Sequence, residues 1–282
     1  MTILVSTMLR CLFLIAASLA STSVGGQPRP EPAVRNITLA RVVRIPVTTQ
    51  KPQDVGQTAK PNVETLLLSP GAQDEPPEGP NGFDVLDDGS FLITDPLRRR
   101  IAVFGSQGSF RQEWRIGFAA DSVTLIPSGL VLVREASTGQ LHGFDRQGQP
   151  RPAEGAALPE PAAARLLTAK SGSVTRPGGA TIEVQFERTG LRLLSLESLA
   201  TDAGGNTYVA LEATAGGETT EGINVNKYVR KYSADGKLVA EIADIPLDYY
   251  VRPVDELRVR KGIVYQLMTA SSEVRINVWD TN

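Results

Sequence analysis

The sequence predicts an all-β protein, a β-propeller built from four-stranded blades. An aromatic residue followed four positions later by glycine recurs at Phe104, Phe144, Phe186 and Tyr232, with spacings of 40, 42 and 46 residues. Short β-type segments separated by turns fill the intervals, and a period of roughly 40–50 residues is typical of propeller blades. About 256 residues remain after an N-terminal targeting segment, close to six blades of roughly 43 residues. We therefore predict six blades, with five as the alternative.

The first repeat, residues 80–114, has the clearest pattern. Strands are predicted at residues 82–86, 90–94, 101–104 and 110–114. Asp88-Gly89 is typical of a tight hairpin turn, and Pro96 ends the second strand because proline cannot donate a ladder hydrogen bond.

The later repeats follow this pattern with decreasing regularity. Gly129 and Gly148 each lie 40 residues after Gly89 and Gly108, which fixes the register of the second repeat. Its strands are predicted at residues 123–126, 130–133 and 141–144. The third repeat is degenerate, with strands at 162–166 and 181–186 and a turn at 171–173. The fourth and fifth are predicted to have strands at 207–210, 225–232, 257–259, 263–267 and 274–279, and a longer polar loop occupies 213–222.

The fifth repeat ends without a fourth strand. Residues 37–47 and 63–68 have β-type patterns near the N-terminus. An N-terminal strand that completes the last blade would remove an exposed sheet edge. We expect one such strand there, and the remaining N-terminal strand could form a partial sixth blade.

The first 26 residues have the pattern of a signal peptide. Arg10 precedes the apolar run at residues 11–17, and Ser18-Leu19-Ala20 fits the small-x-small cleavage rule. The run is shorter than the roughly 20 residues of a membrane span. We expect a secreted or periplasmic protein with no span after cleavage, a Pro-rich linker at 27–35 and one domain at 36–282. A retained N-terminal anchor is the alternative.

The charge and cysteine content narrow the partner classes. The 29 Lys and Arg residues against 31 Asp and Glu residues give a net charge of −2, which gives no reason to expect nucleic acid as a partner. Cys11, the only cysteine, falls in the targeting segment, so the exported chain would have no disulfide. A monomer is expected.

The first repeat resembles an NHL repeat. Pro80-Asn81-Gly82, Asp88-Gly89, a strand ending in Asp95, and Arg100-Ile101-Ala102-Val103-Phe104 match that pattern, although the Asp-Gly turn is shorter here. The resemblance implies membership of a six-bladed propeller group that includes gluconolactonase-like hydrolases, strictosidine-synthase-like enzymes, peptide-amidating lyases and non-catalytic sensor domains. Such a fold does not determine an activity.

Histidine and cysteine chemistry is nearly excluded by composition. His142 is the only histidine and lies on a predicted strand, where a structural role is expected. A zinc site of the usual ligand types and a Ser-His-Asp triad are therefore not expected. We predict a non-catalytic binding or scaffold module for a protein or small ligand, with no catalytic residue and no cofactor.

A loop-bearing face is the predicted contact surface. Arginine suits anion recognition, and adjacent tyrosines suit sugar or peptide contacts. The predicted ligand-binding residues are Asp95, Arg98, Arg99, Glu135, Asp248, Tyr249, Tyr250 and Arg252. Each of these residues also has a structural interpretation. Asp95 could cap its loop by accepting hydrogen bonds from backbone amides. The arginines could lie on a solvated loop, and one of the two tyrosines could pack in the core.

The second hypothesis is a calcium-type hydrolase or lactonase. The resemblance to gluconolactonase-like proteins implies an axial metal held by carboxylate and amide oxygens. The candidate ligands are Asp95, Glu135, Asn226 and Asp248. Convergence of such side chains on a common point would favour this enzyme.

Overall fold

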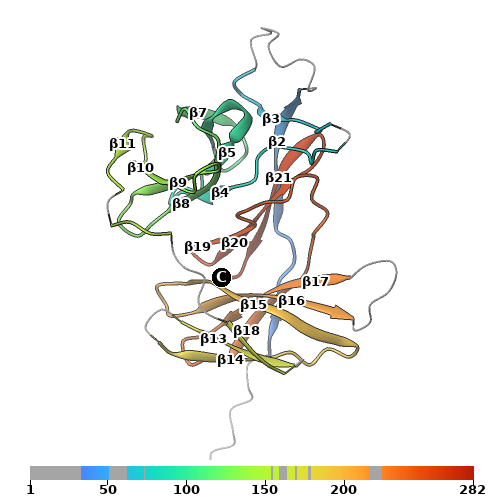
Figure 1. The fold of residues 1–282 in the computed structure, drawn as a ribbon. Helices are drawn as coiled ribbons and strands as arrows, with labels where there is room; N and C mark the ends of the chain where they lie inside the picture. The colour runs from blue at the N-terminus through green and yellow to red at the C-terminus, as the bar shows by residue number, and fades with distance from the viewer. Residues whose placement is uncertain are drawn as a thin grey trace, which may run out of the picture. The chain divides into compact units, whose positions relative to one another are not determined.

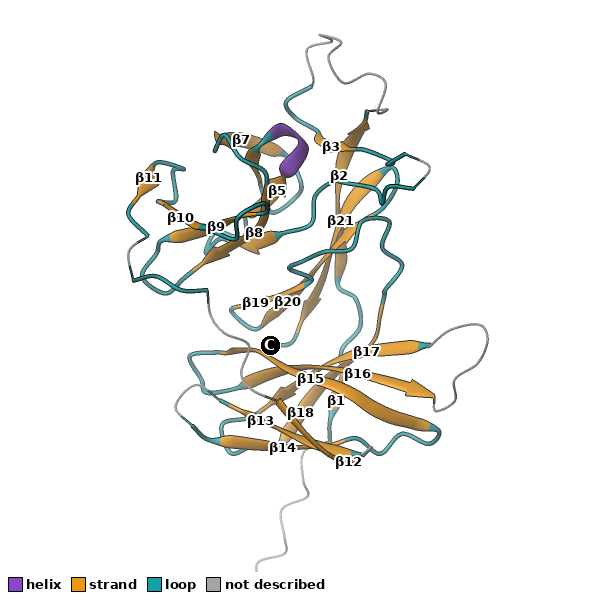
Figure 2. Cartoon of the chain, viewed as in Figure 1, coloured by secondary structure: helices purple, strands orange, loops and turns teal. Residues whose placement is uncertain are grey.

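The computed structural model describes residues 33–50, 62–72, 74–153, 155–158, 164–168, 170–176, 179–215 and 224–282. The predicted signal peptide, residues 1–26, and most of the predicted linker lie outside these ranges. Residues Ala33–Asn282 form one compact unit. Its described part is nearly all β: one 3-10 turn at Pro96–Arg98 interrupts the strands (Figure 2). Within this part no helix is long and apolar enough to cross a membrane.

The described strands form five sheets, labelled by strand in Figure 1. The first three are antiparallel meanders of consecutive strands. The first sheet contains β4 (Phe83–Val85), β5 (Phe91–Asp95), β6 (Arg100–Phe104) and β7 (Phe110–Arg115). The second contains β8 (Ala120–Leu125), β9 (Val131–Glu135), β10 (Leu141–Phe144) and β11 (Pro150–Arg151). The third contains β12 (Ala164–Thr168), β13 (Ser171–Thr175) and β14 (Thr181–Gln185).

The N-terminal strands add to the last two sheets. The fourth sheet contains β15 (Leu191–Thr201), β16 (Thr207–Ala215), β17 (Val225–Tyr232) and β18 (Leu238–Ile245), to which β1 (Arg35–Asn36) adds in parallel. The fifth contains β19 (Leu257–Arg260), β20 (Ile263–Thr269) and β21 (Glu273–Asp280), followed by β2 (Arg41–Thr49) and β3 (Leu66–Leu68).

The predicted N-terminal completion of the last blade is confirmed, because β2 pairs antiparallel with β21. The predicted partial sixth blade is not found: β3 adds in parallel to β2 within the fifth sheet. The described strands therefore form five sheets and no sixth.

The structure differs from the sequence-based expectation at three places. Residues 171–173 form part of β13 instead of a turn, because both edges of this segment pair with neighbouring strands. No strand was predicted at residues 150–151, which form β11 against β10. No strand was predicted at residues 191–201 either, and these form β15, which pairs with β16 along its length through two irregularities.

The recurrent glycines lie at turns with a left-handed backbone. Gly148 ends the turn between β10 and β11 with a φ of 80°, which disfavours any residue with a Cβ atom. A Cβ there would also approach the Trp114 ring to 2.3 Å. This glycine therefore permits both the turn and the packing of the second sheet on the first.

Among the described residues, four apolar clusters each join two sheets. One cluster joins the fifth and first sheets through residues such as Ile276 and Phe91, and another joins the first and second through Leu92 and Val123. The third and fourth sheets share a cluster that includes Val184. The fourth and fifth share one that includes Tyr208 and Trp279.

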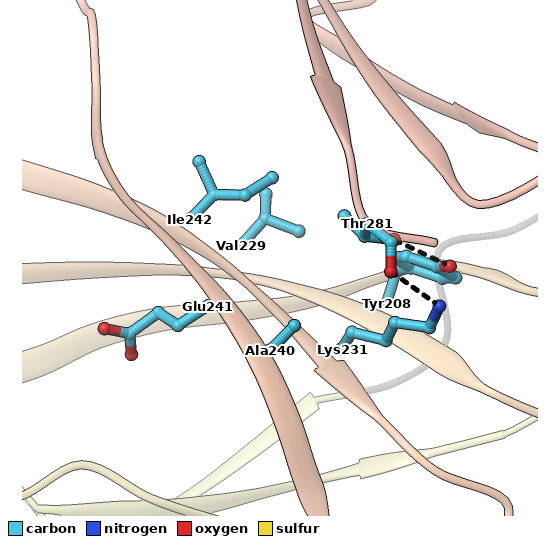
Figure 3. Close-up of a pocket in the computed structure, with 7 residues that line it drawn as sticks. All are labelled: Tyr208, Val229, Lys231, Ala240, Glu241, Ile242 and Thr281. Carbon is cyan, nitrogen blue, oxygen red and sulfur yellow. Dashed lines mark hydrogen bonds between the residues drawn. The ribbon is translucent and has the colours of Figure 1, made fainter. Parts of the chain in front are cut away.

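The C-terminal residues fix the contact between the fourth and fifth sheets. Lys231 Nζ donates to the Thr281 carbonyl at 3.2 Å, and the Tyr208 and Thr281 hydroxyls lie 3.2 Å apart (Figure 3). Arg35 donates to the carbonyls of Thr281 and Asn282 at 2.7 and 3.0 Å. These contacts fill the small hollow in Figure 3, which leaves no room for a water molecule.

Candidate functional site

The segment at residues 248–254, between β18 and β19, alternates between exposed and inward side chains. Asp248, Tyr250, Arg252 and Val254 are exposed, whereas Tyr249 is partly buried and Val251 is buried. Tyr250 N–H donates to the Thr269 carbonyl at 2.9 Å, and Val254 N–H donates to the Asn81 carbonyl at 2.6 Å. The backbone is thus fixed on both sides, and its outward side chains project from a held segment.

Tyr249 belongs to a polar network behind this segment. Its hydroxyl donates to Glu256 and accepts a hydrogen bond from Gln266 Nε2 at 2.9 Å. Gln266 also donates to the Pro246 carbonyl at 2.7 Å and accepts from Asn277 at 3.0 Å. Burial, followed by the hydrogen bond to the Glu256 carboxylate, raises the pKa of Tyr249. The phenol stays protonated and serves as a donor.

Lys227 joins two carboxylates in the same network. Its ammonium lies 2.5 Å from Glu256 Oε2 and 3.1 Å from Glu212 Oε1. Burial disfavours the charged form, but the two glutamates outweigh this effect and raise the pKa of Lys227. The ammonium therefore supplies one positive charge that both carboxylates share and that partly offsets their charge.

A second charged network links the fifth, first and second sheets. Asp84, fully buried on β4, accepts from Arg260 at 3.0 Å and from the Leu125 N–H at 2.6 Å. Arg258 lies 2.7 Å from Asp255, and Asp255 accepts from the Val123 N–H at 3.3 Å. The charged side chains of this network thus connect the three sheets through hydrogen bonds and ion pairs.

Asp95 and Arg98 also join parts of the chain. Asp95 is fully buried, accepts from Arg100 Nε at 2.8 Å and from Leu67 N–H at 3.3 Å. Arg98 donates to the carbonyls of Asn62 and Thr65. Both hold residues 62–67 against the first sheet, whereas the neighbouring Arg99 is exposed and has a left-handed backbone with φ 51°.

The four candidate calcium ligands do not converge. Asp95 is bonded as above, Glu135 accepts from Ser137 and Thr138 at 3.2 and 2.8 Å, and Asp248 lies 3.8 Å from Arg275. Asn226 lies on β17 next to Lys227. Calcium needs about 6–8 oxygen ligands around one point. In the described part of the chain, no three His, Cys, Asp or Glu side chains form such a group. These residues do not fit a calcium centre.

Of the predicted face, Asp248, Tyr250 and Arg252 are exposed on one segment, where they are neighbours in the sequence, and Tyr249 turns inward. Glu135 lies at the end of β9 in the second sheet, near His142. Lys227, Glu212 and Glu256 were not predicted. A charged residue inside an otherwise apolar strand, as at Glu212 in Val209-Ala210-Leu211-Glu212-Ala213, is the signal that could have identified one of them.

No protein-family model matches the chain, and no curated protein matches it. Among solved structures, virginiamycin B lyase from Staphylococcus aureus is similar at 14% identity, over 67% of this chain and 77% of that one, with a TM-score of 0.30. BamB from Moraxella catarrhalis is similar at 13% identity, over 72% and 83%, with a TM-score of 0.30.

A gluconolactonase from Xanthomonas campestris is similar at 10% identity, over 71% of this chain and 86% of that one, with a TM-score of 0.33. These solved structures are β-propeller proteins of varied roles. At such low similarity they carry no argument about the activity of this chain.

Proposed function

We propose that this chain is an exported, non-catalytic binding module of β-propeller type that holds a protein partner on residues 248–254. The observation that carries the proposal is the alternation along this segment. Tyr250 and Val254 are 37% and 48% exposed and Arg252 is also exposed, whereas Val251 is buried and Tyr249 is partly buried. Tyrosine and arginine are the residue types that dominate binding energy at protein interfaces.

The fixed backbone of the segment supports the same function. A segment that is already held by hydrogen bonds loses little conformational entropy when a partner binds. Three outward side chains, Tyr250, Arg252 and Val254, offer an aromatic ring, a guanidinium and an aliphatic group. This combination suits a protein surface with an apolar patch beside a carboxylate.

Neither Tyr249 nor Lys227, which lie behind the segment, is suited to act as a general base. A general base must accept a proton near neutral pH. The raised pKa of Tyr249 keeps its hydroxyl protonated, and Lys227 is held as a cation between two glutamates. Both groups are therefore suited to holding the segment at residues 248–254 in place.

Site-specific photo-crosslinking tests the proposal. A photoreactive amino acid replaces Tyr250 or Arg252 in the full chain, produced with its N-terminal segment in an exporting host. The matched control position is Gln147, exposed in the turn between β10 and β11. We expect protein adducts of one defined mass at positions 250 and 252 and none at 147.

The partner identified in the adduct is then purified and titrated. Tyr250→Ala is expected to weaken its binding at least about tenfold. Adducts at all three positions, or at none, would contradict the proposal. An adduct of twice the chain mass would instead show self-association and overturn the predicted monomer.

Calcium addition tests the hydrolase hypothesis separately. A bound ion stabilises the folded state by mass action. Because the candidate ligands are engaged elsewhere, we expect no change in Tm at millimolar calcium and no lactone hydrolysis above the uncatalysed rate. A rise in Tm accompanied by lactone hydrolysis would contradict the proposed binding module and support the hydrolase hypothesis.

A further inference from the structure

A groove of about 440 Å³ lies between the outer strands of the first and second sheets. It runs from the connection that follows β7 to β10 and β11, strands labelled in Figure 2. Its volume falls within the range of small-molecule sites, about 300–1,000 Å³. The side chains that give it chemical character are Arg115, Phe118, Leu141, His142, Pro150 and Arg151.

One wall of the groove is aromatic. The His142 ring stacks on the Phe118 ring with centroids 4.3 Å apart and an interplanar angle of 27°. His142 Nε2 lies 3.5 Å from Glu135 Oε2, beyond hydrogen-bonding distance for a well-formed bond. Leu141 and Pro150 add apolar surface beside this wall. A flat, apolar body would fit such a lining.

Two guanidinium groups supply positive charge to the same groove. Arg115 donates through Nε to Glu113 at 2.8 Å, and Arg151 donates through Nη2 to Asp145 at 2.6 Å. Their side chains are 85% and 56% exposed. Each carboxylate occupies one side of its arginine, so the remaining N–H groups can donate to a second anion.

We propose that this groove binds a small organic anion, a carboxylate with an aromatic body. The body stacks on the wall of Phe118 and His142, and the carboxylate accepts hydrogen bonds from Arg115 and Arg151. The two arginines complement the charge of such a ligand, since arginine recognises carboxylates in a planar, two-bonded geometry, and the aromatic lining complements its ring. The groove shares no residue with the segment at 248–254 and does not depend on the function proposed for it.

The single histidine makes a specific test possible. His142 is the only histidine in the sequence, so the imidazole region of an NMR spectrum of the histidine-labelled full chain contains one residue's signals. The probe is 3-phenylpropionate. Its matched controls are 3-phenylpropanol, which lacks the charge, and propionate, which lacks the ring.

We expect the His142 signals to shift saturably with 3-phenylpropionate and to shift much less with either control. Arg115→Ala and Arg151→Ala should each raise the Kd about tenfold, the value of one charged hydrogen bond. Arg146→Ala is the matched control: Arg146 is also a partly exposed arginine, paired with Asp87 at 2.8 Å outside the groove. Its Kd should not change.

Three outcomes would overturn the proposal. One is that the His142 signals do not shift at probe concentrations up to roughly 10 mM, which would mean a Kd too high for a binding site. Another is equal affinity for acid and alcohol, which would remove the role of the arginines. The last is an equal loss in Arg146→Ala and the groove variants, which would mean non-specific charge attraction. Thermal melting of each variant confirms that it is folded before titration.

Discussion

The first and third sheets are both antiparallel meanders, yet their sequences follow different rules. In β5, Phe91-Leu92-Ile93-Thr94-Asp95, every residue is buried. In β14, Thr181-Ile182-Glu183-Val184-Gln185, burial alternates with exposure. The first sheet contributes to two apolar clusters and the third to one. A sheet covered on both faces needs continuous apolar strands, whereas one covered on a single face alternates.

The difference decides how each sheet handles charge. Arg100 in the first sheet is 2% exposed and bonds to Asp95, Glu113 and two carbonyl groups. Glu183 in the third sheet points to the exposed face, where water solvates it. In a sheet buried on both faces, every polar side chain needs a hydrogen-bonding partner within the protein. In a sheet buried on one face, polar side chains on the other face are solvated by water.

The largest expected effect comes from breaking the buried pair of the first sheet. Asp95→Ala removes the fully buried carboxylate that pairs with Arg100 and leaves Glu113 and the two carbonyl groups as its partners, so it should lower the free energy of unfolding by about 3 kcal/mol. The matched change is Thr175→Ala, which alters the end of the second strand in the third sheet and should cost less than about 0.5 kcal/mol. Urea unfolding measures both. A cost below about 1 kcal/mol for Asp95→Ala would mean that the pair does not hold this region.

The next comparison is between β5, which is buried on both faces, and β14, which is buried on one face. Leu92, fully buried, faces the second sheet, and Leu92→Ala should cost about 2–5 kcal/mol. Glu183→Ala, at the exposed face of β14, should change stability by no more than about 0.5 kcal/mol. Ile93→Ala and Ile182→Ala remove equally buried side chains and should have similar costs. A large loss for Glu183→Ala would show that the third sheet is covered on its second face.

Glycine substitutions separate backbone strain from packing. Gly148 and Gly179 both have positive φ, 80° and 88°, but a Cβ at Gly179 meets nothing within 4 Å. Alanine at either position should cost about 1–2 kcal/mol from the left-handed backbone. Gly148→Ala should cost about 1–3 kcal/mol more, because its methyl group meets the Trp114 ring. Equal Tm changes for the two variants would mean that Trp114 moves aside without cost.

The smallest effect is a pH dependence at the first hairpin turn. Asp88 accepts hydrogen bonds from the Ser90 N–H at 2.9 Å and from Arg111 at 2.7 Å, and these lower its pKa to about 2. Because the folded pKa lies below the unfolded one, the contribution is complete above about pH 4 and is lost as the pH falls towards 2. Asp88→Asn should therefore cost stability at pH 7 and much less at pH 2, where the carboxyl of the folded protein is about half protonated. Exposure of this carboxylate keeps the difference below about 1 kcal/mol. A cost that is the same at both pH values would assign the effect to the turn backbone.

The sequence predicted most strongly where local chemistry and tertiary packing agree. The glycine turns, the strands of the first sheet and the completion of the last sheet by β2 follow from turn residues and from an unpaired edge. The serine and glycine residues of β13 looked like a turn, but pairing on both edges outweighs their local preference. The number of sheets depended on the placement of β3, which no local pattern determines.

The candidate site was predictable only in part. Tyr249, Tyr250 and Arg252 were identified because they are adjacent in the sequence. The partners of Tyr249 and Lys227 lie on separate strands and loops, and nothing in their spacing indicates that they meet. The alternation that turns Tyr249 inward and Tyr250 outward depends on hydrogen bonds from this segment to Asn81 and Thr269, which are distant in the chain.

The pairing of β2 with β21 has a consequence for the order of folding. Arg41 lies opposite Val278, so the fifth sheet joins residues from opposite ends of the described chain. Contacts between distant residues form slowly, because a long loop must close before they gain any stability. During synthesis the first, second and third sheets can form as each emerges, but β2 stays unpaired until the final strand is made. Until then the edge of β2 that later pairs with β21 stays open, and unpaired strand edges in folding intermediates favour aggregation.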